Sequence, residues 1–210
     1  MRRDAERNRS RILAAAGELF AEQGLDVGVD EIARRAGVGM GTLYRRFPNK
    51  DALVDAILQT VVEDSRSKAE EALATQLPAE ALRWFVIQTV DVGVAGERSV
   101  RHVFLSNRLW TGRMHELMYD QVVPLMEQMF DNARAAGVIR ADVDFTDVLV
   151  LVRALRGVID VTDPVAPGTW HRHLQLIFDG LHPRAIAEPL APGPLDYDGY
   201  RSVTSGQTVE

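Results

Sequence analysis

Residues 30–50, DEIARRAGVGMGTLYRRFPNK, constrain the fold most, because they place two short helical patterns on either side of a glycine. The first pattern puts a set of apolar residues on one helical face. These residues are Val29, Ile32, Ala33 and Ala36. Gly37 follows directly and can adopt the positive φ of a tight turn. A helix, a short turn and a second helix together form a helix-turn-helix.

The second pattern runs from about Met40 to Phe47 and stops at Pro48, which ends the helix. Leu43 and Phe47 are four residues apart and therefore point inward together. The opposite face is basic and aromatic, and it carries Met40, Thr42, Tyr44, Arg45 and Arg46. A helix of this kind fits the major groove of DNA and places its first residues against base edges. We therefore expect a DNA-binding head, followed by a helix that Asn49 caps.

The same stretch resembles a known family. Residues 32–53, IARRAGVGMGTLYRRFPNKDAL, look like the DNA-binding signature of the TetR family of bacterial transcriptional regulators, and residues 12–24, ILAAAGELFAEQG, resemble its first helix. The two matches cover roughly the first quarter of the chain. The rest matches only in helical layout, as the divergent ligand-binding domains of the family do. The resemblance implies a DNA-binding regulator that responds to a small molecule.

The resemblance also implies roles for residues of the head. Tyr44 and Lys50 would contact backbone phosphates. Gly41, Thr42 and Arg45 would lie nearest the base edges. The chemistry agrees, because Arg can bind guanine through two hydrogen bonds, whereas Lys and the Tyr hydroxyl can hold phosphate oxygens. The expected DNA-binding residues are Gly39, Met40, Gly41, Thr42, Tyr44, Arg45, Arg46 and Lys50.

Two positions depart from the family pattern. Gly28 and Gly39 stand where the family often has a Ser or Thr that caps a helix. Glycine caps less well than serine, by only a few tenths of a kcal/mol. The missing hydroxyls could also remove phosphate contacts. We therefore expect these glycines to affect DNA affinity rather than the fold.

The composition excludes several classes of protein. With 210 residues, 46% hydrophobic and 26% charged, the chain can bury a substantial core. It has no cysteine, which excludes disulfides and thiol catalysis. No apolar run approaches the roughly 18 residues of a membrane span, and the first residues lack the apolar core of a signal peptide. We expect a cytoplasmic protein with no membrane partner.

Charge is distributed unevenly along the chain. The net charge of −6 by itself argues against a nucleic-acid partner. Residues 1–50, however, contain ten Lys and Arg against seven Asp and Glu, which gives +3. The remaining 160 residues contain fourteen against twenty-three, which gives −9. A basic head on an acidic body suits a protein that meets phosphates with one end only, although such asymmetry is common.

Helical patterns continue through the rest of the chain, and no alternating strand pattern competes with them, so we expect an all-α fold. The expected helices cover about residues 8–23, 50–73, the stretch after Pro78, 98–110, 113–136, the stretch after Asp144 or Thr146, and 169–183. Pro124 lies inside the fifth of these and is expected to kink it. Five arginines in residues 1–11 form either an arm that reaches DNA or a solvated tail.

Two helices of the body are candidates for a dimer interface. The helix after Asp144 is apolar nearly all round and must be covered on several sides, and the helix over residues 169–183 has an apolar stripe. The expected interface residues are Val152, Leu155, Ile159, Leu174, Ile177 and Phe178.

Methionine and aromatic side chains of the body could line an adaptable apolar pocket, and ordinary core packing is the alternative for each of them. Arg153 and Arg156 lie on the most apolar helix and need anionic partners if they are buried. The expected ligand-binding residues are Trp84, Phe104, Trp110, Met114, Met118, Met126 and Arg153.

No catalytic or metal signature stands out, so we assign no enzyme activity, cofactor or metal. His171 and His173, for example, are two residues apart, whereas helical zinc sites use a spacing of four. We expect a homodimer with a helix-turn-helix domain (residues 1–50), a helical ligand-binding and dimerisation domain (51–183) and an extended or disordered tail (184–210). The expected function is a repressor that a small molecule releases from a palindromic operator. The alternative is a helical small-molecule-binding protein or enzyme that has lost operator binding.

Overall fold

The computed structural model describes residues 2–90, 112–183 and 188–205, and every regular element in these ranges is a helix. The described residues fall into two compact units. Unit 1 comprises residues 2–64, and unit 2 comprises the described residues from Ser65 onward. The expected all-α fold is confirmed. None of the described helices is long and apolar enough to cross a bilayer.

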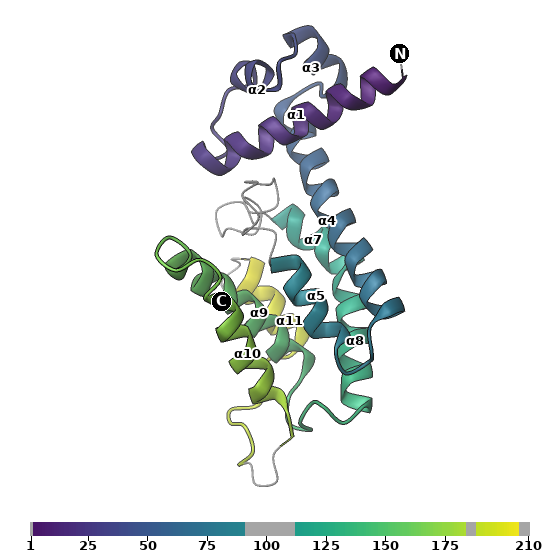
Figure 1. Cartoon of the computed structure of the whole chain (residues 1–210), viewed down its shortest axis with the longest axis vertical. Helices are drawn as coiled ribbons and strands as arrows, with labels where there is room; N and C mark the ends of the chain where they lie inside the picture. The colour runs from purple at the N-terminus through teal and green to yellow at the C-terminus, as the bar shows by residue number, and fades with distance from the viewer. Residues whose placement is uncertain (1, 91–111, 184–187, 206–210) are drawn as a thin grey trace. The chain divides into compact units, whose positions relative to one another are not determined.

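Unit 1 is built from three helices and the beginning of a fourth. They are α1 (Arg2–Gln23), α2 (Val29–Ala36), α3 (Met40–Arg46) and the N-terminal part of α4 (Lys50–Thr75). α1 packs on α2, and α2 contacts α3 (Figure 1). Fully buried apolar side chains come from all four helices and include Ile12, Phe20, Ile32, Leu43 and Ile57. The inward faces predicted for the head are therefore confirmed.

The arginine-rich start of the chain is helical. α1 begins at Arg2, which is well before its apolar pattern starts. Two exposed ion pairs lie one turn apart there: Arg7 with Asp4 at 3.9 Å and Arg9 with Glu6 at 4.0 Å. Asp4 also lies in the first turn, where a carboxylate interacts favourably with the helix dipole. Acids placed three residues before arginines thus extend the helix beyond its apolar stripe.

α4 is one continuous helix of 26 residues. Asn49 caps it as expected, because its Oδ1 accepts a hydrogen bond from the Ala52 backbone N–H at 2.7 Å. The helix runs through the division between the units, which falls between Asp64 and Ser65. The domain boundary expected at residue 50 therefore stays a prediction.

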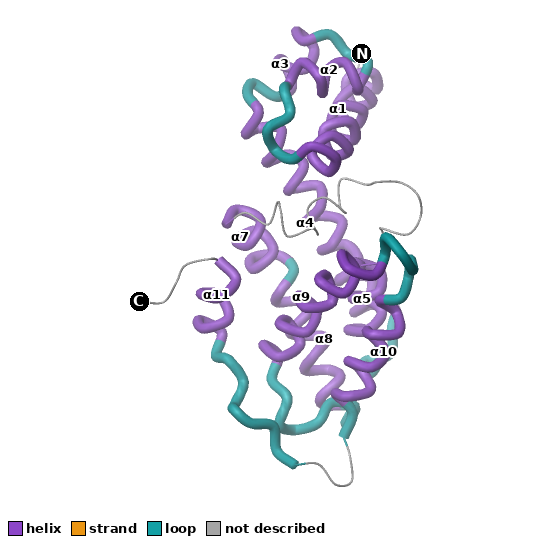
Figure 2. The backbone as a smooth tube through the Cα atoms, turned by 90° about the vertical axis from the view of Figure 1, so that its left-hand side faces the viewer, coloured by secondary structure: helices purple, strands orange, loops and turns teal. Residues whose placement is uncertain are grey.

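Unit 2 contains the remaining helices. They are α5 (Ala81–Val90), α7 (Gly112–Gln121), α8 (Val123–Ala135), α9 (Phe145–Thr162), α10 (Trp170–Leu181) and α11 (Tyr197–Ser205). α5 and α7 both pack on α8, whereas α10 and α11 both pack on α9. Figure 2 shows α10 and α11 on different sides of α9. The core of the unit includes Phe85, Met129, Phe130, Leu155 and Trp170.

The long helix expected over residues 113–136 is divided in two. Val122 has φ −116° and ψ −44°, and it separates α7 from α8. Pro124 lies in the first turn of α8, where a proline needs no hydrogen-bonding partner for its missing N–H. The predicted kink is thus a break between two helices. Gly137, with φ 73°, follows the end of α8 as predicted.

Two other predicted helix starts are resolved by the structure. Pro78 lies in a turn that precedes α5 and is not its first residue. Asp144 caps α9 through reciprocal hydrogen bonds with Asp147, so Asp144 and not Thr146 is the cap. The helix predicted over residues 98–110 lies outside the described residues.

The C-terminal tail corrects our expectation, because part of it is a helix. α11 spans Tyr197–Ser205, and Tyr200 is only 8% exposed. Tyr197 and Tyr200 both pack against the ring of Tyr119 on α7. A contact between residues so far apart in the chain leaves no trace in local composition, which is why the prolines of this tail predicted an extended or disordered segment. The helix over residues 169–183 is therefore not the last one.

Candidate nucleic-acid interface

A left-handed glycine connects α2 to the second helix of the motif. Gly37 has φ 63° and ψ 40°, and its N–H donates to the carbonyl oxygen of Arg34 at 3.1 Å. The N–H of Val38 donates to the carbonyl oxygen of Ala33 at 3.0 Å. These two hydrogen bonds satisfy the last carbonyl groups of α2, as is usual for a helix that ends at a left-handed glycine. The turn that the sequence predicted at Gly37 is confirmed.

α3 presents one buried face and one exposed face. Leu43 and Phe47 are 1% and 4% exposed, so they fix the rotation of the helix about its axis. Met40 and Tyr44 are 38% and 47% exposed, and Arg45 and Arg46 are also exposed. The outward face predicted from the spacing is thus the face that the structure leaves open. Which of these side chains touches DNA stays a prediction.

The Arg45 side chain lies along α3. Its Nε donates to the Gly41 carbonyl oxygen at 3.0 Å, and its Nη2 lies 3.5 Å from the Thr42 hydroxyl oxygen. These contacts reduce the number of rotamers open to the guanidinium. Within the described residues, neither Arg46 nor Lys50 forms an ion pair.

Arg35 forms a brace that the sequence reading did not identify. From α2 its guanidinium donates to two carboxylates of α1, Nη1 to Glu18 Oε2 at 3.2 Å and Nη2 to Glu22 Oε2 at 3.3 Å. These hydrogen bonds raise the pKa of Arg35 above its ordinary value. Glu18 and Glu22 are four residues apart on one helical face, a spacing that could have suggested a shared basic partner. The brace holds α2 against α1 and removes Arg35 from the cations that face a phosphate.

Arg11 makes a second link from α1 to the turn. Its Nη2 donates to the Gly37 carbonyl oxygen at 3.4 Å, and a Cβ at position 37 would overlap this guanidinium. The backbone angle therefore favours glycine at position 37, and a larger residue would also displace the flexible end of the Arg11 side chain. The sequence predicted only the first reason.

The two cap glycines occupy the positions expected of them. Gly28 precedes α2 and Gly39 precedes α3, each with extended backbone and no side-chain cap. A Cβ at Gly39 would meet nothing within 4 Å, whereas a Cβ at Gly28 would overlap the Asp30 carboxylate. A serine would therefore fit at position 39 without rearrangement.

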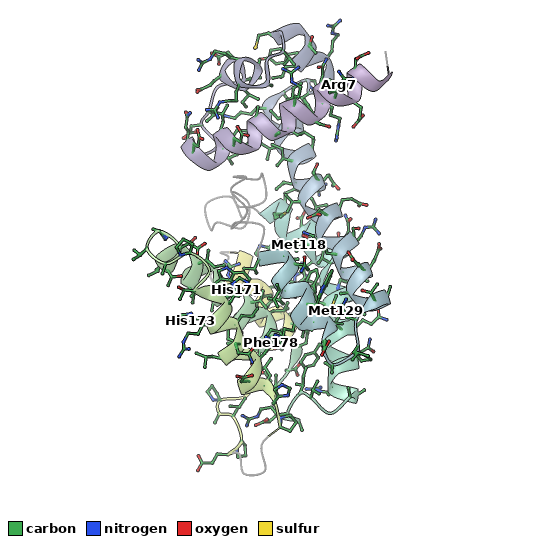
Figure 3. All side chains as sticks on the ribbon, viewed as in Figure 1. Arg7, Met118, Met129, His171, His173 and Phe178 are labelled. Carbon is green, nitrogen blue, oxygen red and sulfur yellow. The ribbon has the colours of Figure 1, made fainter. Side chains whose placement is uncertain are left out.

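The residues expected to bind a ligand are dispersed over several helices of unit 2. Met114 and Met126 are 0% and 5% exposed and belong to its core. Trp84, Met118 and Arg153 are half-buried, and Figure 3 labels Met118 on α7. Phe104 and Trp110 lie outside the described residues. A ligand-binding role for this set stays a prediction.

The residues expected at a dimer interface divide into two groups. Leu155 and Leu174 are 0% and 2% exposed, so they are core residues of the same chain and offer no surface to a partner. The other four are half-buried: Val152, Ile159, Ile177 and Phe178. On a helix that is apolar nearly all round, spacing alone does not tell the inward face from the outward one. Apolar side chains that the sequence reading omitted are more exposed, with Val161 at 77% and Leu176 at 58%.

Two histidine side chains of α10 form hydrogen bonds with backbone carbonyl groups three or four residues earlier in the chain. His171 Nδ1 lies 3.0 Å from the Gly168 carbonyl oxygen, and His173 Nδ1 lies 3.1 Å from the Thr169 carbonyl oxygen (Figure 3). In the part of the chain that the structure describes, no three metal-ligating side chains gather.

Two family models match the chain. The model described as bacterial regulatory proteins, tetR family, matches residues 12–57. The model described as the C-terminal domain of SbtR-like transcriptional regulators matches residues 77–183, which is half of the chain. The first match spans the helix-turn-helix, and the second ends where α10 ends.

Similar proteins agree with the family models. An HTH-type transcriptional regulator of Staphylococcus aureus is 30% identical over 156 residues, which are 71% of this chain and 79% of the relative. The crystal structure of a TetR transcription regulatory protein from Mycobacterium vanbaalenii is 33% identical, with a TM-score of 0.56 over 87% of this chain and 99% of that one.

A second similar structure is CprB from Streptomyces coelicolor, solved in complex with its biological operator sequence. It is 23% identical, with a TM-score of 0.67 over 85% of this chain and 90% of that one, and at this identity it shows the fold alone. The helix-turn-helix geometry, the two family models and the relatives agree. The chain therefore belongs to the TetR family of bacterial transcriptional regulators, which are DNA-binding transcription factors and not enzymes.

Proposed function

We propose that this chain is a repressor that binds a palindromic operator as a homodimer and is released by a small molecule. The observation that carries the proposal is the exposed face of α3, where Tyr44, Arg45 and Arg46 stand on a helix whose rotation two buried residues fix. A short helix with a basic, aromatic outer face can enter the major groove. A repressor of this kind acts in the cytoplasm, where bacterial DNA is accessible.

Each side chain of the outer face has a distinct proposed role. Arg45 reads a base, because its contacts with Gly41 and Thr42 hold the guanidinium near the first turn of α3. Tyr44 and Lys50 hold phosphates, and Arg46 supplies a further cation. Gly39 and Gly41 have no side chain, so that the backbone at the start of α3 can approach the DNA, and Met40 offers an exposed apolar side chain beside them.

The proposed dimer interface uses the apolar surface of α9 and α10. Val152, Ile159, Ile177 and Phe178 are half-buried in the single chain, and Leu176 is 58% exposed. A second copy would cover this surface symmetrically. Two heads related by a twofold axis would then require a palindromic site, because half-sites must lie about 34–36 Å apart to be bound together. CprB, a protein of the same fold, has been solved in complex with its operator sequence, which supports operator binding by this fold.

The proposed effector is an apolar small molecule bound in unit 2. Met114, Met118 and Met126 contribute flexible thioether side chains from α7 and α8, and Trp84 contributes a half-buried ring from α5. Methionine and aromatic residues adapt to varied ligands. The sequence also predicts Phe104 and Trp110 for this role, and both lie outside the described residues. Arg153 would pair with an acidic group of the ligand.

The proposed coupling runs through α4, because this helix begins at Lys50 beside α3 and continues to Thr75 in unit 2. A tilt of α4 caused by the ligand would change the spacing of the two recognition helices in a dimer. Coupling of typical size, about 1–3 kcal/mol, would lower operator affinity roughly 5- to 150-fold. By reciprocity, the operator would weaken ligand binding by the same factor.

The test uses the purified full-length chain and fluorescent duplexes. Fluorescence anisotropy would measure binding to duplexes from the region upstream of its own gene, with a scrambled duplex as the control, while light scattering measures the oligomeric state. We expect a dimer whose affinity for one palindrome falls steeply with salt concentration. A monomer at micromolar concentration that shifts no duplex would refute the proposal and favour a small-molecule-binding protein instead.

A further inference from the structure

The C-terminal strap, residues 188–205, lies beyond the part of the chain that the family model of the C-terminal domain matches, since that match ends at residue 183. Within unit 2 the strap returns along the other helices and ends in α11, which packs on α9 (Figure 2). It is held at three separate places, and each uses a different kind of interaction.

The first anchor is an ion pair that holds the backbone of the strap. Arg140 donates to both carboxylate oxygens of Asp142, from Nε at 2.6 Å and from Nη2 at 2.7 Å. The same Nη2 donates to the Glu188 carbonyl oxygen at 3.1 Å, and Asp142 Oδ2 accepts from the Leu190 N–H at 3.1 Å. The connection between α8 and α9 thus binds two backbone groups of the strap.

The second anchor is a single buried hydroxyl. Thr146, in the first turn of α9, is 5% exposed, and its Oγ1 donates to the Leu195 carbonyl oxygen at 2.7 Å. A buried hydroxyl without such an acceptor would be costly. Thr146 therefore favours the docked position of the strap.

The third anchor is a group of aromatic rings on α7 and α11. The ring of Tyr119 meets Tyr197 edge-on at 5.4 Å, Tyr200 at 6.3 Å and the guanidinium of Arg201 at 5.4 Å, all measured from ring centroids. The three strap residues lie at i, i+3 and i+4, so they share one face of α11. His115, also on α7, stacks on Tyr119 with ring centroids 5.7 Å apart.

These anchors together connect α7 to α9. The principal contacts of α7 among the described helices are with α8, while α11 packs on α9. Tyr119 belongs to α7 and Thr146 belongs to α9, so the strap joins two helices by holding one side chain of each. α7 also carries Met114 and Met118, two of the side chains assigned above to the effector site.

The strap combines a short helix with apolar side chains that stay partly exposed after docking. α11 has nine residues, and isolated helices shorter than about 12 residues are marginal in water. Tyr200 is buried, but Leu190, Leu195 and Tyr197 remain 50%, 45% and 38% exposed, so docking covers these three apolar side chains only in part. Segments with few buried contacts open locally while the rest of a domain stays folded.

We propose that the C-terminal strap is a detachable clamp, which ties α7 to α9 when docked and slows the entry of an apolar molecule between the helices of unit 2. Its regulatory part rests on the effector site proposed above. The clamp itself depends only on the contacts of Tyr119, Thr146 and the Arg140–Asp142 pair. When the strap detaches, α7 loses the link to α9 that runs through the strap and can move more freely, while its contacts with α8 remain.

The test compares the full-length chain with three variants. Thr146→Val removes the second anchor, Tyr200→Ser weakens the third, and a stop codon at position 188 removes the strap. Thr162→Val is the matched control, because the Thr162 hydroxyl donates within α9 to the Val158 carbonyl oxygen at 2.7 Å. Hydrogen exchange measured by mass spectrometry follows α7. Stopped-flow fluorescence follows binding of anilinonaphthalene sulfonate, an anionic dye whose aromatic rings bind accessible apolar surface.

We expect amide exchange in α7 to accelerate about fivefold to tenfold in Thr146→Val, as the loss of one buried hydrogen bond would give, and to accelerate further in the shortened chain. Binding of the probe should become faster in the same order. A synthetic peptide of residues 188–205, added to the shortened chain, should restore slow exchange and slow binding. Thr162→Val should behave like the full-length chain.

Other outcomes would contradict the proposal in distinct ways. Exchange that accelerates only within residues 188–205 would make the strap a passive tail. Global unfolding of both Tyr200→Ser and the shortened chain, seen as loss of helical circular dichroism, would make the strap an obligatory part of the fold and not a clamp. Probe binding absent from every variant would instead count against the effector site, while exchange in α7 would still decide whether the clamp exists.

Discussion

The two units differ in how well the residue pattern of a helix predicts which of its sides is buried. In unit 1 the short helices each have one apolar side, and residues such as Leu43 and Phe47 are buried where their spacing predicts. In unit 2, α9 is apolar nearly all round, and its Leu155 is 0% exposed while its Val161 is 77% exposed. The spacing of apolar residues therefore distinguishes the exposed face of a helix from the buried face only when one side of the helix is polar.

The largest expected effect tests this difference within unit 2. Leu155→Ala should lower the free energy of unfolding by about 2–5 kcal/mol, because it leaves a cavity in the core. Leu176→Ala should change the unfolding of the monomer little, since that side chain is 58% exposed, but should weaken the proposed dimer. Urea denaturation measures the first quantity and sedimentation measures the second. Equal losses of stability would contradict the assignment of Leu155 to the core and Leu176 to the surface.

The next effect concerns the outer face of α3 in unit 1. Arg45→Ala should cost about 1–3 kcal/mol of binding, mainly at one base position, because a bidentate contact to a base is lost. Lys50→Ala should weaken all duplexes similarly and reduce the salt slope by about one charge. Anisotropy titrations against single-base variants of the operator, repeated at several salt concentrations, separate the two results. If both variants lose only uniform affinity, Arg45 contacts a phosphate.

A somewhat smaller effect separates the two glycines that flank the turn of unit 1. Gly37→Ala should destabilise the head by about 1–2 kcal/mol, because position 37 is left-handed and a Cβ there would overlap Arg11. Gly39→Ala is the matched control, with an extended backbone and open space around its Cβ. The melting temperature and the affinity for the operator should both fall in Gly37→Ala and stay unchanged in Gly39→Ala. A normal melting temperature for Gly37→Ala would show that the turn rearranges without cost.

The smallest effect appears only in acid and belongs to the first anchor of the strap in unit 2. The Arg140 guanidinium, by hydrogen bonding, lowers the pKa of Asp142 from 3.8 to about 2, and the Leu190 N–H acts in the same direction. Since the pKa is lower in the folded chain, the stabilisation is present above about pH 4 and is lost as the pH falls towards 2.

Asp142→Asn should therefore melt at a lower temperature than the natural chain at pH 5 to 7, and the difference should shrink towards pH 2. Circular dichroism melts at several pH values measure this. Asp179→Asn is a suitable control, because Asp179 accepts from the Gln175 side chain on the outside of α10. A difference in melting temperature that does not change with pH would show that the pair does not hold the strap by its charge.

Much of the recognition head could be predicted from local patterns. The turn at Gly37, the inward faces of α2 and α3 and the cap at Asn49 all depend on residues within four positions of one another. The brace from Arg35 to Glu18 and Glu22 could not be predicted in the same way, because it joins two helices whose packing decides which charges meet.

Local sequence by itself predicted most of the described helices before residue 184, the cap at Asn49, the turn at Gly37 and an interruption at Pro124, because helix formation depends on spacing, on caps and on backbone angles over a few residues. Only the tertiary structure decided that Leu155 is inside and Val161 outside, and that residues after Tyr197 form a helix against Tyr119. Those outcomes depend on burial against residues distant in the chain. A nine-residue helix is stable only where another surface covers it, and local composition does not encode that surface.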